Sequence, residues 1–255
     1  MKNIPFLTQS LLFAQISALA YKDGKEAFDG FRQLGFESEF FDCDGSQAYV
    51  LFGKNDLILA FRGTQPNELK DIIADIRIKL VPSSSGNGKV HRGFKGALDK
   101  IWPNIEPILI MNKKKKNIYF TGHSLGAAMA TLAAGRCSRL INTPQPTGLF
   151  TYGSPRVGSK KYIRYLTELD FPHARWVNNI DIVTKIPLFG YRHHAHSQYL
   201  DHNGHLAKMT PLQLAIDRLK GFWTGIKRGE VNYFVNHGSA KYITNIAKNI
   251  DIPWH

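Results

Sequence analysis

Residues 117–130 read NIYFTGHSLGAAMA, and this stretch decides the fold. The apolar run Ile118-Tyr119-Phe120 predicts a short buried strand, and the Ala- and Leu-rich residues 125–140 predict a helix. The segment Gly122-His123-Ser124-Leu125-Gly126 joins the two as a tight turn of the form Gly-x-Ser-x-Gly. A strand, a tight turn with this pattern and a helix are together typical of a nucleophile elbow, in which the serine stands at the turn.

The elbow needs small residues on both sides of Ser124. Gly122 and Gly126 have no Cβ atom that could clash with the neighbouring strand and helix, while the serine itself takes unusual φ and ψ angles. Its side chain then projects at a helix N-terminus, where backbone N–H groups and the helix dipole favour developing negative charge. Ser124 is therefore the candidate nucleophile. The alternative is an ordinary strand-to-helix turn with a capping serine.

Strands and helices alternate around the elbow. A hairpin of two strands is predicted at 48–52 and 56–61, further strands at 149–152 and 174–178, and helices at 93–111 and 160–169. Residues 191–205 are predicted to form an edge hairpin, and 211–255 are mostly helical in pattern. Alternation of this kind favours one α/β domain over residues 1–255, with a mainly parallel sheet covered by helices on both faces. Reactive groups in such a sheet lie beyond the carboxyl ends of its strands.

The N-terminus and the cysteines bear on the compartment. Residues 1–20 resemble a signal peptide, but polar residues interrupt the apolar run, and the pattern also suits an amphipathic helix that stays with the fold. Cys43 and Cys137 are too few for a disulfide framework, so both are expected to be free thiols. These observations favour a cytoplasmic location slightly over secretion.

The chain is strongly basic, with 33 Lys and Arg against 20 Asp and Glu, a formal charge of +13. Such a field attracts anionic partners, either a lipid surface or nucleic acid. No basic motif interleaved with aromatic residues is present, so specific nucleic-acid binding rests on the net charge alone. The sequence says nothing about the oligomeric state.

Several segments in collinear order resemble one family. They are Phe61-Arg62-Gly63-Thr64, the segment 90–93 (VHRG), the elbow itself, the segment 152–158 (YGSPRVG) and the segment 178–187 (NNIDIVTKIP). Together with Ala18-Leu19-Ala20-Tyr21, they are similar to the class 3, fungal-lipase-like branch of the α/β hydrolases. The resemblance covers roughly residues 11–245. It implies an α/β-hydrolase fold and a serine ester hydrolase.

A serine hydroxyl needs a base, and the base needs a group that orients it. In α/β hydrolases the order along the chain is Ser, then Asp or Glu, then His. Asp181 follows a predicted strand and matches the family's acid, whereas Asp170 lies in the turn before that strand. By resemblance the base is His237. The chain departs from the family there, because Asn236 stands where Asp is usual and Gly238 separates His237 from Ser239.

The resemblance also assigns residues to an oxyanion hole, the pair of N–H groups that binds the negative oxygen of the tetrahedral intermediate. One donor is the N–H of Leu125, directly after the nucleophile. The other is Thr64, with Gly63 allowing close approach. His123 is expected to pack beneath the elbow as a structural histidine. Residues 65–79 carry an apolar stripe that fits either a lid or an ordinary surface helix.

A second cluster offers an alternative chemistry. The stretch 191–205 contains His193, His194, His196, His202 and His205, and histidine is a common metal ligand. The stretch lacks partnering cysteines and the His-Glu-x-x-His pattern, so no metal site is assigned. The resemblance instead places Tyr191-Arg192-His193 and Tyr199-Leu200 in a hairpin beside the site, with His193 lining it.

The sequence therefore predicts a cofactor-independent carboxylic ester hydrolase, with acylglycerols or related lipid esters as the expected substrates. A phospholipase A1-type enzyme or a feruloyl or small-ester esterase would use the same groups. A noncatalytic membrane-binding relative remains the alternative of another class, since the sequence departs from the family around His237.

Overall fold

An eight-stranded sheet forms the centre of the computed structural model, which describes residues 4–63, 79–141, 143, 145–227 and 237–250. Its strands are β1 (Glu37–Cys43), β2 (Ser46–Phe52), β3 (Asp56–Phe61), β6 (Asn117–His123), β7 (Pro146–Tyr152), β8 (His173–Asn178), β9 (Ser197–Leu200) and β10 (Leu206–Ala207), neighbours in that order. The five strands from β3 to β9 pair in parallel, whereas β1, β2 and β10 pair antiparallel at the two edges. A separate hairpin joins β4 (Leu80–Pro82) to β5 (Lys89–His91).

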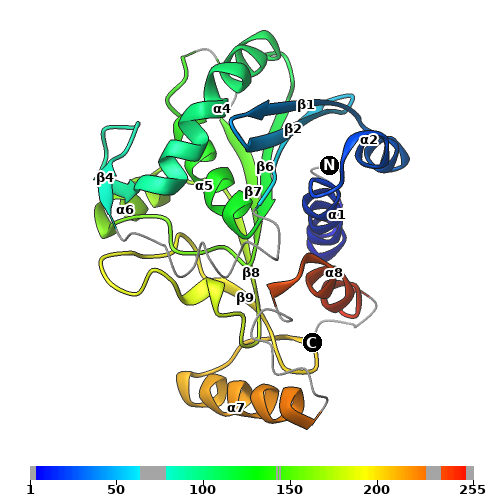
Figure 1. Ribbon diagram of the computed structural model, residues 1–255, viewed down its shortest axis with the longest axis vertical. Coiled ribbons are helices and arrows are strands. Elements are labelled where there is room, and N and C mark those ends of the chain that lie inside the picture. The colour runs from blue at the N-terminus through cyan, green and yellow to red at the C-terminus, as the bar shows by residue number, and fades with distance from the viewer. Residues whose placement is uncertain (1–3, 64–78, 142, 144, 228–236, 251–255) are drawn as a thin grey trace.

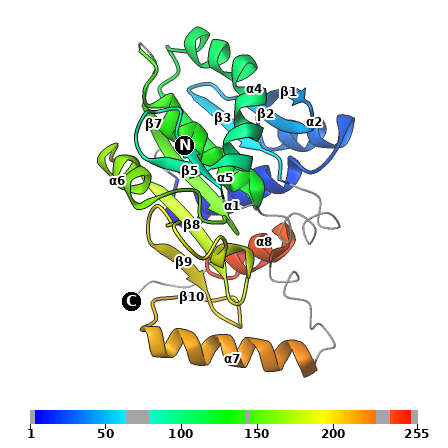
Figure 2. The ribbon, with the colours of Figure 1, turned by 60° about the vertical axis from the view of Figure 1, so that its left-hand side comes forward.

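Helices cover both faces of this sheet (Figure 1). On one side lie α4 (Arg92–Met111), α5 (Leu125–Cys137) and α6 (Lys160–Glu168). On the other side lie α1 (Phe6–Leu19), α2 (Gly24–Gln33) and α8 (Ser239–Ala247). The remaining helix, α7 (Pro211–Lys227), lies at one end of the molecule, outside both layers, as Figure 2 shows from a second side. The mainly parallel sheet between two helical layers was predicted from the alternation in the sequence.

Two hydrophobic cores lie on the two faces of the sheet, and alternate strand residues feed them. On β6, Phe120 packs into the core with α4 and α5, whereas Tyr119 packs into the core with α1 and α8. On β3, Leu59 packs into the same core as Phe120, and Ile58 packs into the same core as Tyr119. The near-continuous apolar runs of these central strands follow from burial on both faces.

Helix α1 is part of the second core. Phe13 and Ile16 are fully buried, and the Ser17 hydroxyl lies 2.8 Å from that of Thr121 on β6. Loss of residues 1–20 would expose this face of the sheet, so α1 behaves as a helix that stays with the fold. None of the helices in the described ranges combines the length and the apolar character needed to cross a bilayer. Cys43 and Cys137 are both free thiols, as expected.

The sequence prediction was wrong at the edge of the sheet after β8. The hairpin there is β9–β10, over residues 197–207, and Tyr191-Arg192-His193 forms no strand with Tyr199-Leu200. Instead β9 pairs in parallel with β8. Before β9, His193 donates from Nε2 to the Thr184 carbonyl at 2.7 Å, and Arg192 forms an isolated antiparallel bridge with Gly158. Strand β1 and helix α2 were not predicted at all.

Candidate active site

The elbow has the backbone geometry that its glycines predicted. Ser124 lies between β6 and α5 with φ 58° and ψ −126°, and it is almost fully buried. A Cβ atom on Gly122 would lie 2.4 Å from the Gly126 carbonyl, and one on Gly126 would lie 2.1 Å from the Phe61 carbonyl oxygen. Any other residue at these two positions would push β6 away from α5, or α5 away from the end of β3. Ser124 is thus held at the N-terminus of a 13-residue helix.

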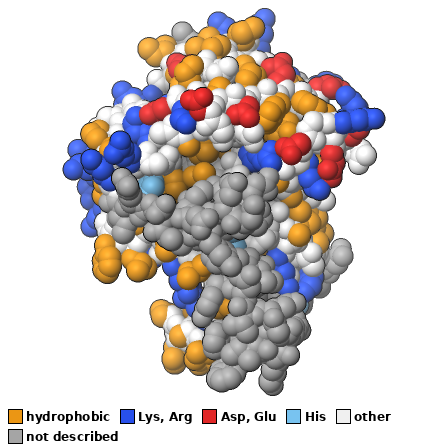
Figure 3. Space-filling model, in the orientation of Figure 1, with side chains coloured by type: hydrophobic (Ala, Val, Ile, Leu, Met, Phe, Trp, Pro, Cys, Tyr) orange, Lys and Arg blue, Asp and Glu red, His pale blue; other side chains and the backbone are white. Residues whose placement is uncertain are grey.

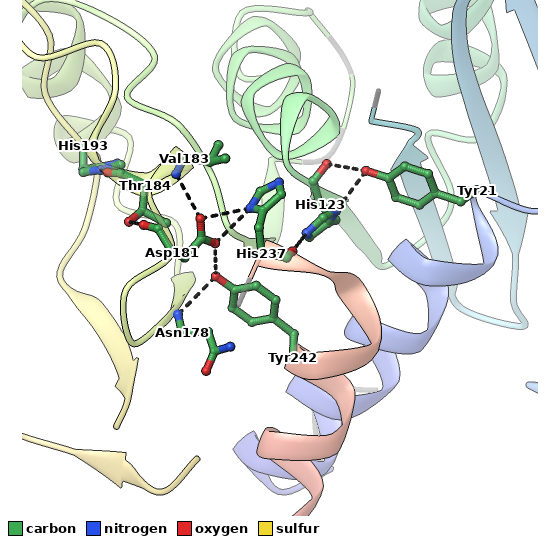
Figure 4. Close-up of polar contacts among 9 residues, drawn as sticks. All are labelled: Tyr21, His123, Asn178, Asp181, Val183, Thr184, His193, His237 and Tyr242. Carbon is green, nitrogen blue, oxygen red and sulfur yellow. Dashed lines mark hydrogen bonds and ion pairs between the residues drawn. The ribbon is translucent and has the colours of Figure 1, made fainter. Parts of the chain in front are cut away.

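His237 and Asp181 form a buried pair (Figure 4). Asp181 lies just beyond the carboxyl end of β8, and His237 lies just before α8. The Nδ1 atom of His237 is 2.9 Å from Oδ2 and 3.0 Å from Oδ1 of Asp181. A carboxylate accepts, so Nδ1 carries a proton, and in the tautomer with its one proton on Nδ1 the Nε2 atom keeps its lone pair. This is the tautomer that a general base for a serine hydroxyl needs.

Two further donors fix the orientation of the Asp181 carboxylate. The Val183 N–H donates to Oδ1 at 3.0 Å, from the short 3₁₀ helix Val183–Lys185. The Tyr242 hydroxyl, one turn into α8, donates to Oδ2 at 2.7 Å and accepts from the Asn178 N–H at 3.1 Å. With His237, three groups therefore donate to this carboxylate. Burial, and then the charge of Asp181, raise the pKa of Tyr242 well above its usual value, so the phenol keeps its proton.

The Ser124 Oγ atom and the His237 Nε2 atom are both buried without a hydrogen-bond partner among the described residues. A buried hydroxyl and a buried imidazole nitrogen without partners are costly to maintain, and in proteins such groups call for an explanation. In enzymes without substrate, the bond between nucleophile and base is often long and shortens only when substrate binds. Ser124 Oγ is thus a free hydroxyl and His237 Nε2 a free acceptor, as the expected nucleophile and base would be.

His123 holds the backbone of the base. Its Nε2 donates to the His237 carbonyl, and its Nδ1 lies 2.9 Å from the Tyr21 hydroxyl. Desolvation by burial, and then the neighbouring His237 ring, lower the pKa of His123 to about 3, so it is neutral. Because Nε2 donates, Nδ1 must accept from Tyr21. The predicted structural histidine is therefore also a link from the end of α1 through the elbow to His237, as Figure 4 shows.

Gly153, at the end of β7, leaves the space that the Asp181–His237 pair occupies. Its φ is +60°, and a Cβ atom there would lie 2.8 Å from both Asp181 Oδ2 and His237 Nδ1. We expect Gly153→Ala to lower kcat on a soluble ester by about 10²-fold, the effect of a displacement of about 1 Å in a catalytic group. Steady-state kinetics measure this. The matched control is Gly96→Ala in α4, where a Cβ atom meets nothing within 4 Å. Equal losses in the two variants would contradict the packing argument.

The oxyanion donors are only partly within the described residues. Leu125 is the first residue of α5, so its N–H is one of those that lack a partner within the helix. Gly63 approaches the elbow closely, because a Cβ atom on it would lie 2.1 Å from the Tyr21 hydroxyl and 2.6 Å from the His123 carbonyl oxygen. Thr64 and most of the segment 65–79, predicted as second donor and as lid or surface helix, lie outside the described residues.

The other histidines lie apart from the pair. His193 bonds to Thr184, and in Figure 4 its ring is on the far side of Thr184 from His237. His194 is buried with Nδ1 3.0 Å from that of His173, and His196 and His205 are exposed. His202 lies within 4.8 Å of Asp201 and Asp217, in an arrangement that could hold a metal ion. The oxygens of Asp217 already accept from Tyr199, Asn179 and His202, so these contacts explain the cluster without an ion.

Buried neutral histidines make stability depend on pH. Desolvation, and then Arg175, lower the pKa of His193 to about 3 and that of His194 to about 4. In the unfolded chain both take up protons near pH 6.5. The unfolded state therefore binds more protons between about pH 6.5 and 4, so the free energy of unfolding is complete above this window and falls as the pH falls through it.

We expect His193→Gln to reduce this pH dependence by up to about 1.4 kcal/mol per pH unit, because one proton-binding group is removed. The Gln amide can still donate to the Thr184 carbonyl. Urea unfolding at pH 7, 6, 5 and 4 gives the slope. His205→Gln, at an exposed position, is the control and should leave the slope unchanged. Identical slopes for wild type and His193→Gln would show that folding does not lower the pKa of His193, and would contradict this prediction.

Some residues that build the site were not found from the sequence. Gly153 and Tyr21 were noted only as parts of family segments, and Asn245 was not noted at all. The Asn245 amide donates to Asn178 Oδ1 at 3.0 Å and so fastens α8 to the end of β8. Its one signal is the spacing from Tyr242, since residues three apart share a helix face.

Comparisons with known proteins place this geometry in a family. The doubly covered sheet with a serine elbow after β6, an acid after β8 and a histidine near the end is an α/β-hydrolase fold. The family model described as Lipase (class 3) matches residues 58–191, about half of the chain. The chain belongs to the class 3 lipase family.

The relatives share only part of their length with the chain. It is 36% identical over 117 residues to the "Secreted mono- and diacylglycerol lipase 1" of Fusarium solani. The aligned region covers 44% of this chain and 34% of that protein. It is 33% identical over 171 residues to a lipase of Rhizopus niveus, 62% of this chain and 42% of that one. The solved structure of lipase II from Rhizopus niveus superposes with a TM-score of 0.67 at 26% identity, over 76% of this chain and 80% of that one.

Proposed function

We propose that the protein is a serine carboxylic ester hydrolase that cleaves acylglycerols. The observation that carries this proposal is the His237–Asp181 pair, whose Nδ1–H bond leaves Nε2 free as a base, together with Ser124 on the strained elbow. Support for lipid esters comes from the two curated relatives, which are named as lipases. The geometry and the names are independent of each other.

In the proposed reaction Ser124 Oγ attacks the ester carbonyl carbon and gives its proton to His237 Nε2. The charge that develops on His237 is stabilised by Asp181, which is fully buried. The carbonyl oxygen becomes negative and takes a hydrogen bond from the Leu125 N–H at the positive end of α5, and from Thr64 as the second donor. His237 then returns the proton to the leaving alcohol, and an acyl ester on Ser124 remains.

Water completes the cycle. His237 takes a proton from a water molecule, whose oxygen attacks the acyl carbon, and the proton passes back to Ser124 as the carboxylic acid leaves. Proton transfer and acyl transfer between oxygens need no cofactor. The Tyr21–His123 link and the Tyr242–Asp181 bond hold His237 in place through both halves of the reaction.

The test measures hydrolysis and labelling together. Wild-type protein is assayed on nitrophenyl esters of increasing acyl length, then on mono-, di- and triacylglycerol and on phosphatidylcholine emulsions. We expect turnover of long-chain acylglycerols above that of short esters. A fluorophosphonate should label one peptide, the one that contains Ser124. Labelling elsewhere, or no turnover of any ester with detergent or lipid present, would contradict the proposal; preference for phosphatidylcholine would correct the substrate to a phospholipid.

A further inference from the structure

Helix α7 buries an acidic side chain and exposes apolar ones, the reverse of an ordinary surface helix. Within residues 211–221, the part of the helix whose side chains are described, the buried side chain is Asp217, a carboxylate with 4% exposure, whereas Leu212, Ile216 and Leu219 are 71%, 45% and 59% exposed. The spacing of four and three residues places these three on one face of the helix. A surface helix normally buries such a stripe and exposes its acids.

Among the side chains of α7 that the structure describes, Asp217 attaches the helix to the sheet through polar contacts. Asp217 accepts from the Asn179 amide at 2.7 Å and from the Tyr199 hydroxyl at 2.8 Å, and it pairs with His202. Gly221, one turn further, lies so close that a Cβ atom on it would be 2.2 Å from Asn179 Oδ1. These contacts orient the helix so that the face with Asp217 lies against the sheet and the apolar face is directed outwards.

The attachment points lie at the edge of the sheet where the carboxyl ends of the parallel strands meet, here called the catalytic edge. Asn179 follows the last residue of β8, and it is two residues before Asp181. His202 follows the end of β9. The carboxyl ends of these parallel strands and of β6, which leads into Ser124, face the same way. Helix α7 is therefore attached at the edge of the sheet on which the candidate site lies.

Other apolar side chains are exposed in the same part of the chain. Leu188 and Phe189, in the loop after Asp181, are 58% and 80% exposed, and Arg156 holds this loop by donating to the Pro187 and Leu188 carbonyls. Figure 3 shows hydrophobic side chains gathered at the lower left, over the first half of α7. Contiguous exposed apolar surface marks a binding surface for protein or membrane.

The charge around α7 selects between these two. The described residues 182–221 carry five cationic side chains against two acidic ones, and Asp217 is buried; the cations are Lys185, Arg192, Lys208, Arg218 and Lys220. Arg218 lies near enough to Lys185 to help lower its pKa, after the larger effect of burial. Apolar residues among cations are the composition of a helix that lies in an anionic lipid interface.

We propose that the outer face of α7, formed by Leu212, Ile216 and Leu219, inserts into the surface of an anionic lipid membrane and brings the catalytic edge of the sheet against it. This inference rests on the proposed function for its biological sense, since a lipid ester hydrolase must reach an aggregated substrate. It does not rest on turnover. Membrane binding does not need the Ser124 hydroxyl, so it can be measured with Ser124→Ala protein.

The experiment compares vesicle binding of three proteins in the Ser124→Ala background. The first has no further change, the second carries Leu212→Ser, Ile216→Ser and Leu219→Ser, and the third carries Met111→Ser and Ile141→Ser. Met111 and Ile141 are 81% and 83% exposed but lie before the amino ends of β6 and β7, at the opposite edge. Sedimentation with phosphatidylglycerol–phosphatidylcholine vesicles and with pure phosphatidylcholine vesicles gives the partition constants.

We expect the α7 variant to bind anionic vesicles about tenfold or more weakly, because membrane affinity scales with the apolar area that is buried. The Met111/Ile141 variant should bind as the parent does, and the parent should prefer anionic vesicles. Unchanged far-UV circular dichroism and melting temperature show that the α7 variant is folded. Equal binding of parent and α7 variant would overturn the proposal, as would a dimer in sedimentation velocity that only the α7 variant loses, because the face would then bind a second copy. Failure of ester hydrolysis with binding intact would remove the proposed function alone.

Discussion

Ser124→Ala should lower kcat on a soluble nitrophenyl ester by about 10⁴- to 10⁶-fold, the range seen when a nucleophile is removed from a triad that acts as a unit. The structure gives the reason. The Ser124 hydroxyl is held on the elbow by glycines on both sides, and it is buried without a partner among the described residues, as is Nε2 of His237. Initial rates for wild type and variant over a series of acyl lengths measure the change.

A second serine provides the control for this experiment. Ser138 lies directly after α5, and its hydroxyl donates to the Ala134 carbonyl at 3.0 Å. Ser138→Ala removes a hydroxyl from the far end of the same helix and should leave kcat within about twofold, since surface changes away from such sites are nearly neutral. A Ser124→Ala protein that keeps wild-type turnover would show that another group is the nucleophile. Equally negligible rates for wild type and Ser124→Ala would favour a noncatalytic membrane-binding relative.

Asp181→Asn should lower kcat by about 10⁴-fold, the loss known when the acid of a serine triad becomes an amide. Three donors meet at the Asp181 carboxylate, from Val183, His237 and Tyr242. An amide has one acceptor oxygen, so at least one of these donors must face an N–H group. If the donor that is lost is His237 Nδ1–H, the ring takes the other tautomer and Nε2 can no longer accept a proton.

The rejected acid provides the control for Asp181→Asn. Asp170 lies before β8 with φ 53°, a conformation that Asn tolerates well, so Asp170→Asn should leave kcat and the melting temperature near wild type. Circular dichroism separates a change in chemistry from a change in folding. Similar kcat values for Asp181→Asn and wild type would remove Asp181 from the mechanism and leave the buried pair as a structural contact.

The centre of the fold was predictable, because local sequence and tertiary structure agree there. The strand at 117–121, the helix from 125 and the strand at 174–178 all appear, with ends that differ by a few residues. Burial on both faces makes such strands apolar throughout. The close backbone contacts around Gly122 and Gly126 require glycine at these two positions. The structure brings Asp181 and His237 into contact, although Asn236 and Gly238 depart from the family pattern, and their roles as acid and base stay a prediction.

The edges of the sheet were harder to predict. Strand β1 reads ESEFFDC and is mostly exposed or half-buried, so its sequence has no apolar face to reveal it. The sequence of the stretch 191–205 resembles a hairpin. In the structure, His193 instead bonds to the Thr184 carbonyl, which lies outside this stretch. No local pattern contains that contact. Gly153 was missed for the same reason, since it is required by atoms of Asp181 and His237 from two other elements.

The lean towards a cytoplasmic location came from the sparse cysteines and the retained helix. A relative whose printed name describes it as secreted points the other way.

The Tyr21–His123–His237 link has a consequence for the order in which the protein becomes competent. Tyr21 follows α1 and His237 precedes α8, so the base depends on segments 216 positions apart that only the finished fold unites, and α1 packs directly on α8. A nascent chain that has released the elbow and Asp181 from the ribosome still lacks His237, the proposed base. The proposed reaction therefore cannot begin until residue 237 has emerged and the bonds from His123 to Tyr21 and to the His237 carbonyl have formed.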